Sequence, residues 1–322
     1  AMQERVRFWV RIFTQVSHTE VVLHDRDDLR VVYDVVPLGA AGNGGPVDAA
    51  RATYGRMLAS MAVEDLSPPR LLVPAPERLR VRALFDRCGP RGYVRAIGNI
   101  RAQRGLKEIF ADSLVRSELY LPTIRRIFRE TGLPAELVYI PHVESSFNPN
   151  AVSRAGAAGL WQFTRDTADA HLKIGGAVDE RFDPVRSSAA AATHLARARS
   201  VLGSWPLAVA SYNHGVAGIA RARAAIGSDS LDDIIRGYEG ASFGFASRNF
   251  YAEFLAAAHV AQHTAYYFPD LKREPILHYV VRPGDSLWKI ARQHRVTVRA
   301  LVAANNLGRT PLQQGQRLMI RL

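Results

Sequence analysis

The stretch VESSFNPNAVSRAGAAGLWQF, residues 143–163, decides how this chain of 322 residues is interpreted. It contains one acid, Glu144, and the next one is Asp166. Small, hydroxylated and amide-bearing residues follow Glu144, and the stretch ends with aromatic side chains around Gln162. Enzymes that cut sugar chains usually need two carboxylates, so a site of that kind raises the question of where the second one is.

Glu144 follows Ile140 and Pro141 by four and three positions, so on a helix it lies on an apolar stripe and faces the interior. We expect a helix over 133–146 with Pro134 in its first turn and a bend at Pro141. Burial raises the pKa of a carboxyl, and a glutamic acid that is protonated near neutral pH can donate its proton to a glycosidic oxygen. The alternative is a structural Glu144 that caps a helix or pairs with an arginine.

The composition predicts a globular protein with one large and one smaller domain, because 48% of the residues are hydrophobic and 22% are charged. No run of about 18 apolar residues appears, which argues against a membrane-spanning helix in the sequence as given. The single cysteine, Cys88, allows no internal disulfide, and we expect it to be a buried spectator thiol. The net charge of +12 is carried mainly by arginine and favours a polyanionic partner.

Residues 1–90 predict a mixed α/β region whose role the sequence leaves unknown. In 20–36, two β-branched runs flank an Asp-rich turn, which is typical of a hairpin. A glycine-rich loop at 37–46 precedes a helix expected over 48–62, and the prolines of 67–77 predict an extended linker.

From 88 to 265 the pattern predicts helices and no sheet, and we expect one helical domain over 91–270. Further helices are expected over 160–172, 189–202 (capped by Ser187 or Ser188 and closed by Gly203), 206–214 and 246–264.

The sequence pattern changes from helical to mixed after Asp270. The pattern predicts a strand over 279–282, helices from Ser286 and Thr297, and a strand over 317–321. This βααβ unit defines a third domain over 278–322, which holds eight basic residues against one acid. A core this small is only marginally stable alone.

Groups suited to gripping a sugar cluster after Glu144. Glycines there leave the backbone open to close approach by a ligand, and aromatic rings beside amides suit a carbohydrate subsite. Core packing is the alternative for the rings, and we favour it for Phe163. Tyr212 and Asn213 end a helix and could reach the same cleft, although a buried tyrosine bonded to backbone is the alternative. The groups in the first stretch are Ser145, Ser146, Asn148, Ser153, Gly156, Gly159, Trp161, Gln162 and Phe163.

The histidines do not predict a metal site. His142, His194 and His214 occur in no HExxH or comparable ligand spacing. We therefore expect neither a metal nor another cofactor.

Four motifs in order resemble those of the family 1 lytic murein transglycosylases, and most closely the branch of membrane-bound lytic transglycosylase D. They are PHVESSFNPNAVSRAGAAGLWQFTRDTA (141–168), DERFDP (179–184), SWPLAVASYNHGVAG (204–218) and FGFASRNFYAEFLAA (243–257). The segment 101–137 also resembles the one that precedes the catalytic helix in that branch.

The resemblance implies a mainly α, lysozyme-like (goose-type, SLT) domain that cuts the β-1,4 bond between N-acetylmuramic acid and N-acetylglucosamine. Glu144 takes the position of the sole catalytic acid/base. The last family motif usually resembles ETRNYV, and here Phe250 and Tyr251 replace its single tyrosine. The substrate-binding residues that we expect are Ser145, Ser153, Gly159, Gln162, Tyr212, Asn213 and Tyr251.

The implied chemistry answers the question of the second carboxylate. After Glu144 protonates the leaving oxygen, the C6 hydroxyl of the muramic sugar attacks C1 and leaves a 1,6-anhydro end, so an intramolecular nucleophile replaces the activated water. The alternative is that Asp179, Glu180 or Asp183 acts as the base of a hydrolase. We expect structural roles for these three acids, at helix entries and in pairs with arginine.

The C-terminal unit resembles a LysM module, which implies binding of glycans that contain N-acetylglucosamine, through loops at 283–287 and 305–308. We expect Trp288 in its core. The glycan-binding residues that we expect are Gly284, Asp285, Ser286, Leu287, Asn306 and Leu307.

We therefore expect a monomeric peptidoglycan lytic transglycosylase of the periplasm or cell envelope. Its expected partner is the glycan strands of peptidoglycan. No recognised nucleic-acid motif accompanies the arginines. Ala1 and Met2 look like a cloning remnant, which leaves open an export signal and an outer-membrane anchor ahead of them. The alternatives are a goose-type hydrolytic muramidase and a non-catalytic peptidoglycan-binding protein.

Overall fold

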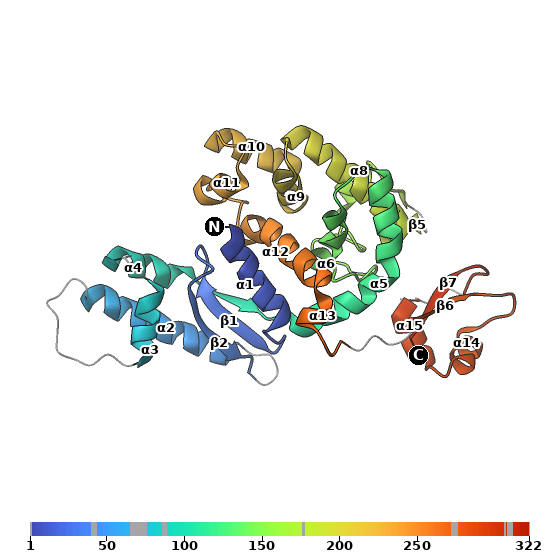
Figure 1. Ribbon diagram of the computed structural model, residues 1–322, viewed down its shortest axis with the longest axis horizontal. Coiled ribbons are helices and arrows are strands. Elements are labelled where there is room, and N and C mark those ends of the chain that lie inside the picture. Colours follow the sequence, from blue (N-terminus) through green and yellow to red (C-terminus); the bar gives the residue numbers. More distant parts are fainter. Residues whose placement is uncertain are drawn as a thin grey trace.

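The computed structural model describes residues 2–39, 44–64, 76–85, 89–175, 178–271, 276–305, 307 and 312–321. It is mainly helical, as the sequence predicts. Figure 1 shows the small sheet and most helices of the N-terminal region towards one end, a helical body in the middle and a small C-terminal module at the other end, while the N-terminus itself lies beside the body. Cys88, expected as a buried thiol, lies outside the described residues.

The N-terminal region contains the predicted hairpin. Strands β1 (Glu20–Asp25) and β2 (Val32–Pro37) pair antiparallel. The aromatic face of α1 (Met2–Thr14) packs in one core with α12 (Phe245–Gln262) of the helical body. The remaining helices here are α2 (Gly45–Glu64), α3 (Pro76–Leu84) and α4 (Gly89–Asn99).

The expectation that 88–265 contains no sheet is wrong. Residues Ile100–Arg104 form β3, which pairs antiparallel with β1 in the order β2-β1-β3. A strand of five residues whose partner strand lies about 80 positions earlier leaves no clear signal in the local sequence pattern. A Cβ on Gly105, directly after β3, would lie 2.2 Å from the Ser17 carbonyl oxygen, so glycine permits this close approach. The strand ties the N-terminal sheet to the body.

The body packs around a core to which Phe128, Trp161, Leu195 and Phe254 contribute. Its helices are α5 (Lys107–Glu130), the 3-10 turn η2 (Ala135–Tyr139), α6 (Ile140–Glu144), α7 (Arg165–Ala168), α8 (Pro184–Leu202), α9 (Trp205–His214), α10 (Val216–Ile226), α11 (Leu231–Gly237), α12 and α13 (Thr264–Tyr267). Between α7 and α8 lie two short antiparallel strands of two residues each, β4 (Ile174–Gly175) and β5 (Val178–Asp179), and the 3-10 turn η3 (Glu180–Phe182).

Two predicted helices differ from the structure. The helix expected over 133–146 is a 3-10 turn followed by the short α6, because Pro141 lacks the N–H that a continuous helix would need. The helix expected over 160–172 is reduced to α7. Residues 158–163 form a turn instead, in which the backbone N–H groups of Ala158 and Phe163 each donate to the other's carbonyl. Thr164 then caps α7.

Helix α8 begins earlier than expected. The carboxylate of Asp183 accepts hydrogen bonds from the backbone of Val185 and Arg186, and Pro184 occupies the first helical position. The expected caps, Ser187 and Ser188, are instead buried inside the helix. Gly203 ends it in the left-handed conformation, as expected.

The C-terminal module has the predicted βααβ order. Strands β6 (Ile276–Val280) and β7 (Arg317–Arg321) pair antiparallel and enclose α14 (Leu287–Gln293) and α15 (Val298–Asn305).

The expectation that Trp288 lies in the core of this module is wrong, because it is 59% exposed. Leu287, Ile290 and Ala291 form the inward stripe of α14, and Trp288 lies beside that stripe. The Arg292 guanidinium covers its ring at 5.1 Å.

None of the helices in the described ranges combines the length and apolar character that a bilayer crossing requires.

Candidate active site

Glu144 is the last residue of α6. Val143, directly before it, packs against two core clusters, and Phe147 after it is fully buried. The Glu144 side chain stays partly exposed, although protein surrounds its carboxyl. Burial first, and then the charge of Glu253, raise the pKa of Glu144 to about 8. Within the described ranges Glu144 neither caps a helix nor pairs with an arginine.

Glu253 is the residue that the sequence analysis missed. It lies on α12, half-buried, and burial raises its pKa to about 8 although Arg101 opposes that shift. A signal existed in the sequence, because Glu253 follows Phe250 by three positions and precedes Ala257 by four in an otherwise apolar stretch. Glu253 is near enough to Glu144 for its charge to raise the pKa of that carboxyl.

Hydrogen bonds hold the residues that follow Glu144 in place. The buried Ser145 hydroxyl donates to the Leu160 carbonyl oxygen at 2.8 Å, which joins the two ends of the 143–163 stretch. Arg116 on α5 donates from Nε to the Ser146 carbonyl oxygen at 2.9 Å. These bonds fix the backbone that follows the acid.

Three predicted substrate-binding residues help to build this loop. The Gln162 amide nitrogen donates to the carbonyl oxygens of Ala151 (3.1 Å) and Gly159 (2.9 Å). The Ser153 hydroxyl accepts from the backbone N–H of Ala157 at 3.0 Å. Gly159 has φ +80°, and a Cβ there would lie 1.8 Å from the Arg181 carbonyl oxygen. The group that closely approaches Gly159 is therefore the protein's own backbone at Arg181.

Tyr212 is within electrostatic reach of Glu144. Burial and then the charge of Glu144 raise the pKa of its phenol well above the ordinary value. Its hydroxyl donates to the Trp161 carbonyl oxygen at 2.8 Å, as in the alternative of a tyrosine bonded to backbone. The structure therefore brings Tyr212 and Glu144 together.

Asn213 and Tyr251 lie at the junction of α9 and α12. The exposed Asn213 accepts a hydrogen bond from the Ser247 hydroxyl at 2.9 Å. Tyr251 is half-buried and packs between two core clusters, whereas its neighbour Phe250 is buried and stacks parallel to Tyr212.

Both rings of LWQF belong to the core, which confirms the core role favoured for Phe163, whereas the idea that Trp161 stacks on a sugar is wrong. Trp161 is 0% exposed, stacks on Phe128, and donates from Nε1 to the Ser188 hydroxyl at 2.9 Å. Phe163 is also buried.

The acids of DERFDP have the structural roles that were expected. Asp179 pairs with Arg181, and Glu180 accepts from the backbone N–H of Lys173 at 2.8 Å. Asp183 caps α8. Each of these carboxylates already has a partner in the protein.

The histidines show no metal site. No group of three or more His, Cys, Asp or Glu side chains that could hold an ion occurs in the part of the chain that the structure describes. The buried His142 lies with Nδ1 2.5 Å from the Ser113 hydroxyl. Burial, with a smaller effect of Arg116, lowers its pKa to about 3 and keeps the ring neutral.

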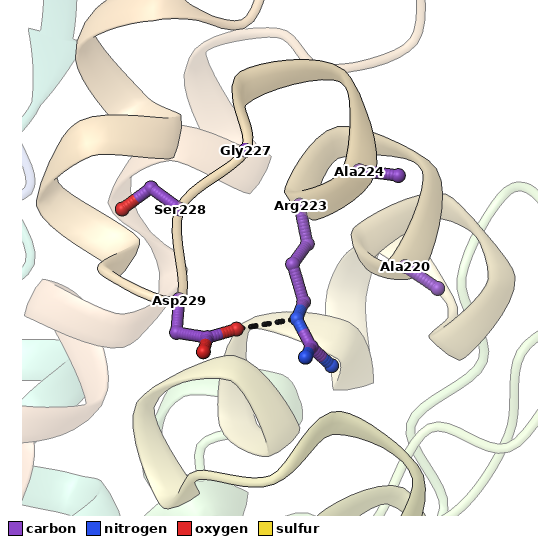
Figure 2. A pocket seen from close by; sticks show the side chains of 6 residues that line it. All are labelled: Ala220, Arg223, Ala224, Gly227, Ser228 and Asp229. Atoms are coloured by element: carbon purple, nitrogen blue, oxygen red, sulfur yellow. Dashed lines mark ion pairs between the residues drawn. The ribbon is translucent and has the colours of Figure 1, made fainter.

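A surface hollow elsewhere is separate from this chemistry. Figure 2 shows it between α10 and α11, where Arg223 reaches across to Asp229 and pairs with it at 2.5 Å. None of the predicted site residues lines it.

The first loop of the C-terminal module is built by hydrogen bonds. Asp285 accepts from the Tyr279 hydroxyl at 2.8 Å and from the backbone of Arg282 at 2.7 Å. Ser286 caps α14, and Gly284 has φ +80°. Among the remaining predicted residues, Leu287 and Leu307 pack against the core, and Asn306 lies outside the described residues.

Two family models match this arrangement of domains. Residues 124–234 match the transglycosylase SLT domain, and residues 279–321 match the LysM domain. The chain therefore carries a transglycosylase SLT domain followed by a LysM domain.

Individual relatives are similar over part of the chain. Membrane-bound lytic murein transglycosylase D of Escherichia coli (strain K12) is 39% identical over 111 residues, which are 34% of this chain and 25% of that protein. Membrane-bound lytic murein transglycosylase C of Haemophilus ducreyi is 47% identical over 55 residues, which are 17% of this chain and 15% of that protein. The matches thus span a quarter or less of these relatives.

A solved structure of the lytic transglycosylase Slt from Pseudomonas aeruginosa aligns with 68% of this chain and 44% of its own, at 18% identity. The TM-score of this alignment is 0.39.

Proposed function

We propose that this protein is a peptidoglycan lytic transglycosylase that cuts the β-1,4 bond between N-acetylmuramic acid and N-acetylglucosamine and leaves 1,6-anhydro ends. One observation carries the proposal. Within the SLT match, the Glu144 carboxyl has no bonded partner among the described residues and has a pKa of about 8, so it holds a proton at neutral pH.

The mechanism uses Glu144 twice. Its proton passes to the leaving glycosidic oxygen as the bond from C1 to that oxygen breaks, and the neighbouring acetamido group stabilises C1. The Glu144 carboxylate then takes the proton of the C6 hydroxyl, and O6 bonds to C1. A carboxyl with a raised pKa is also a stronger base, which suits this second step. Glu144 thus regains a proton from the C6 hydroxyl, the first proton stays on the leaving sugar, and no water is consumed.

Glu253 favours a second candidate, a hydrolytic muramidase. A second carboxyl within electrostatic reach of the acid could activate a water, which is the arrangement of inverting glycosidases. The two functions differ in their products, because hydrolysis leaves reducing ends.

The domain division that we propose is 1–90 for the N-terminal α/β region, 91–270 for the catalytic domain and 278–322 for the LysM module. In this proposal the LysM module binds glycans through its two loops and raises the local concentration of the catalytic domain on an insoluble polymer. Its excess of basic residues favours attraction to anionic groups of the wall. We place the protein, as a monomer, in the periplasm or cell envelope.

The test is digestion of purified sacculi followed by mass analysis of the sugar termini. We expect anhydro ends from the wild type and a loss of about 100-fold or more in rate for Glu144→Gln. Glu130→Gln, which changes an exposed glutamate on α5, is the matched control and should retain the wild-type rate. Reducing ends would identify the muramidase, and an absence of release by the wild type would identify a non-catalytic binding protein.

A further inference from the structure

We propose that Arg116 is a positioning residue. By holding the carbonyl of Ser146 it keeps the left-handed turn that ends the catalytic helix, and so it fixes the direction of the Glu144 carboxyl. This role rests on the proposed function, because it takes Glu144 as the acid. Arg116 itself touches no reacting atom in this scheme.

The backbone directly after Glu144 has an unusual conformation. Ser146 has φ +53° and Phe147 has φ +56°, so two consecutive residues with side chains lie in the left-handed region. That region suits glycine, and a bulky residue such as phenylalanine is seldom found there. Such a conformation persists only where the surrounding structure imposes it, and it occurs mostly at functional sites. Contacts from elsewhere in the protein must therefore hold this turn.

The turn folds the chain back onto the end of α6. The Pro141 carbonyl oxygen accepts hydrogen bonds from the backbone N–H groups of Ser145 at 3.1 Å and of Phe147 at 3.0 Å. Phe147 is fully buried, and its ring meets the His142 ring edge-on with the ring centres 4.5 Å apart. The helix therefore stops at Glu144, and the direction of that side chain depends on whether the turn keeps its shape.

Helix α5 is attached to the chain on both sides of Glu144. The Ser113 hydroxyl lies 2.5 Å from Nδ1 of His142, two positions before the acid. Arg116, one turn further along α5, donates from Nε to the Ser146 carbonyl oxygen at 2.9 Å, two positions after the acid. Both bonds come from one helix, which packs against α6 (Figure 1). The catalytic residue is thus bracketed by two hydrogen bonds from the same neighbour.

Of these two attachments, Arg116 is the one that reaches the strained backbone. Ser113 bonds a residue inside α6, whereas Arg116 bonds the residue with φ +53°. Without this bond Ser146 can relax towards the broadly allowed backbone regions, which rotates the peptide next to Glu144. A displacement of about 1 Å at a catalytic group costs about 100-fold in rate. Arg116 therefore acts on the rate through the position of the acid.

The first test measures kcat and KM on soluble glycan strands of peptidoglycan. Arg116→Gln should lower kcat by about 10-fold or more and change KM by less than about 3-fold, because the groups that bind the substrate are still present. Arg126→Gln, which changes an exposed arginine on the same helix, is the matched control and should keep the wild-type values. A change in KM alone would overturn the positioning role.

The second test repeats this substitution in a glycine background. Ser146→Gly accepts the left-handed conformation without a steric cost, so the turn depends less on the Arg116 bond. Arg116→Gln should therefore cost about 3-fold or less in kcat when it is added to Ser146→Gly, against about 10-fold or more in the wild type. An arginine that acted through its charge or through the substrate would cost the same in both backgrounds.

The third test observes the turn without any activity. The N–H groups of Ser145 and Phe147, which both bond the Pro141 carbonyl, should exchange with solvent several-fold faster in Arg116→Gln than in the wild type, as measured by NMR. The Arg126→Gln control should exchange like the wild type.

The outcomes separate the two proposals. A wild type that releases no muropeptide, with faster exchange in Arg116→Gln, would overturn the proposed function and leave the effect of Arg116 on the turn established. Equal losses of kcat with and without Ser146→Gly would overturn the positioning role. If Arg116→Gln does not fold, Arg116→Lys, which keeps the charge and lacks the Nε donor, takes its place in the same comparison, and equal losses there would count in the same way.

Discussion

Arg181 holds Asp179 through two parallel hydrogen bonds, from Nε to Oδ1 at 2.9 Å and from Nη2 to Oδ2 at 2.7 Å. The third nitrogen of the guanidinium donates to the carbonyl oxygens of Gly156 (2.9 Å) and Phe163 (3.1 Å). The pair therefore fastens DERFDP to the loop that follows Glu144. An acid bound in this way stabilises the loop and is not free to activate a water.

Asp179→Ala should lower the free energy of unfolding by about 3–5 kcal/mol, because it leaves a buried guanidinium without its partner. Thermal or urea unfolding measures the loss, and Asp166→Asn on an exposed surface is the control. Arg181 lowers the pKa of Asp179, so this stabilisation is present above the ordinary pKa of 3.8 and is lost as pH falls through the lowered value. An Asp179→Ala protein as stable as the control would contradict the fastening role.

Gly159→Ala should destabilise the protein more than Gly156→Ala. Both glycines have a positive φ, so both changes carry a backbone cost of about 1 kcal/mol. Only at Gly159 would the new Cβ meet backbone, 1.8 Å from the Arg181 carbonyl oxygen, whereas nothing lies within 4 Å at Gly156. Urea unfolding of the two variants compares the costs, and equal losses would show that the loop yields easily.

Glu144→Gln should stabilise the folded protein at alkaline pH. The folded pKa of about 8 lies above the ordinary 4.5, so wild-type stability falls as pH rises through this window and the loss is complete above it. Glutamine has no charge to bury. At about pH 9 the melting temperature should rise by roughly 2–4 °C for each kcal/mol relieved, with little change at about pH 4. A difference that does not depend on pH would refute the raised pKa.

Trp288→Ala should leave the stability of the C-terminal module nearly unchanged, within about 0.5 kcal/mol, because the ring is mostly exposed. Ile290→Ala, two positions along the same helix and 0% exposed, should cost about 2–5 kcal/mol. Hydrogen exchange of peptides from β6 and β7 in the full chain measures both. A large loss of protection in Trp288→Ala would return the ring to the core.

Local patterns in the sequence were enough for much of the architecture. The hairpin at 20–36, the helix of 246–264 and the order of the C-terminal module all follow from spacing, caps and breakers that act within a few residues. The apolar stripe that includes Ile140 also placed Glu144 in surroundings that raise its pKa. These features depend on side chains that are neighbours in the chain, so a single sequence is sufficient to predict them.

The tertiary structure alone decided what surrounds that carboxyl. β3 forms because β1, 80 residues earlier, offers an edge, and it carries Arg101 towards α12. Glu253 comes within electrostatic reach of Glu144, 109 positions earlier in the chain, only because α12 packs against α6. Trp161 belongs to the core because Phe128 and Ser188 reach it from two helices, α5 and α8. Burial and charge are sums over neighbours in space, and the sequence lists neighbours along the chain, so the acid itself could be predicted while its electrostatic partner could not.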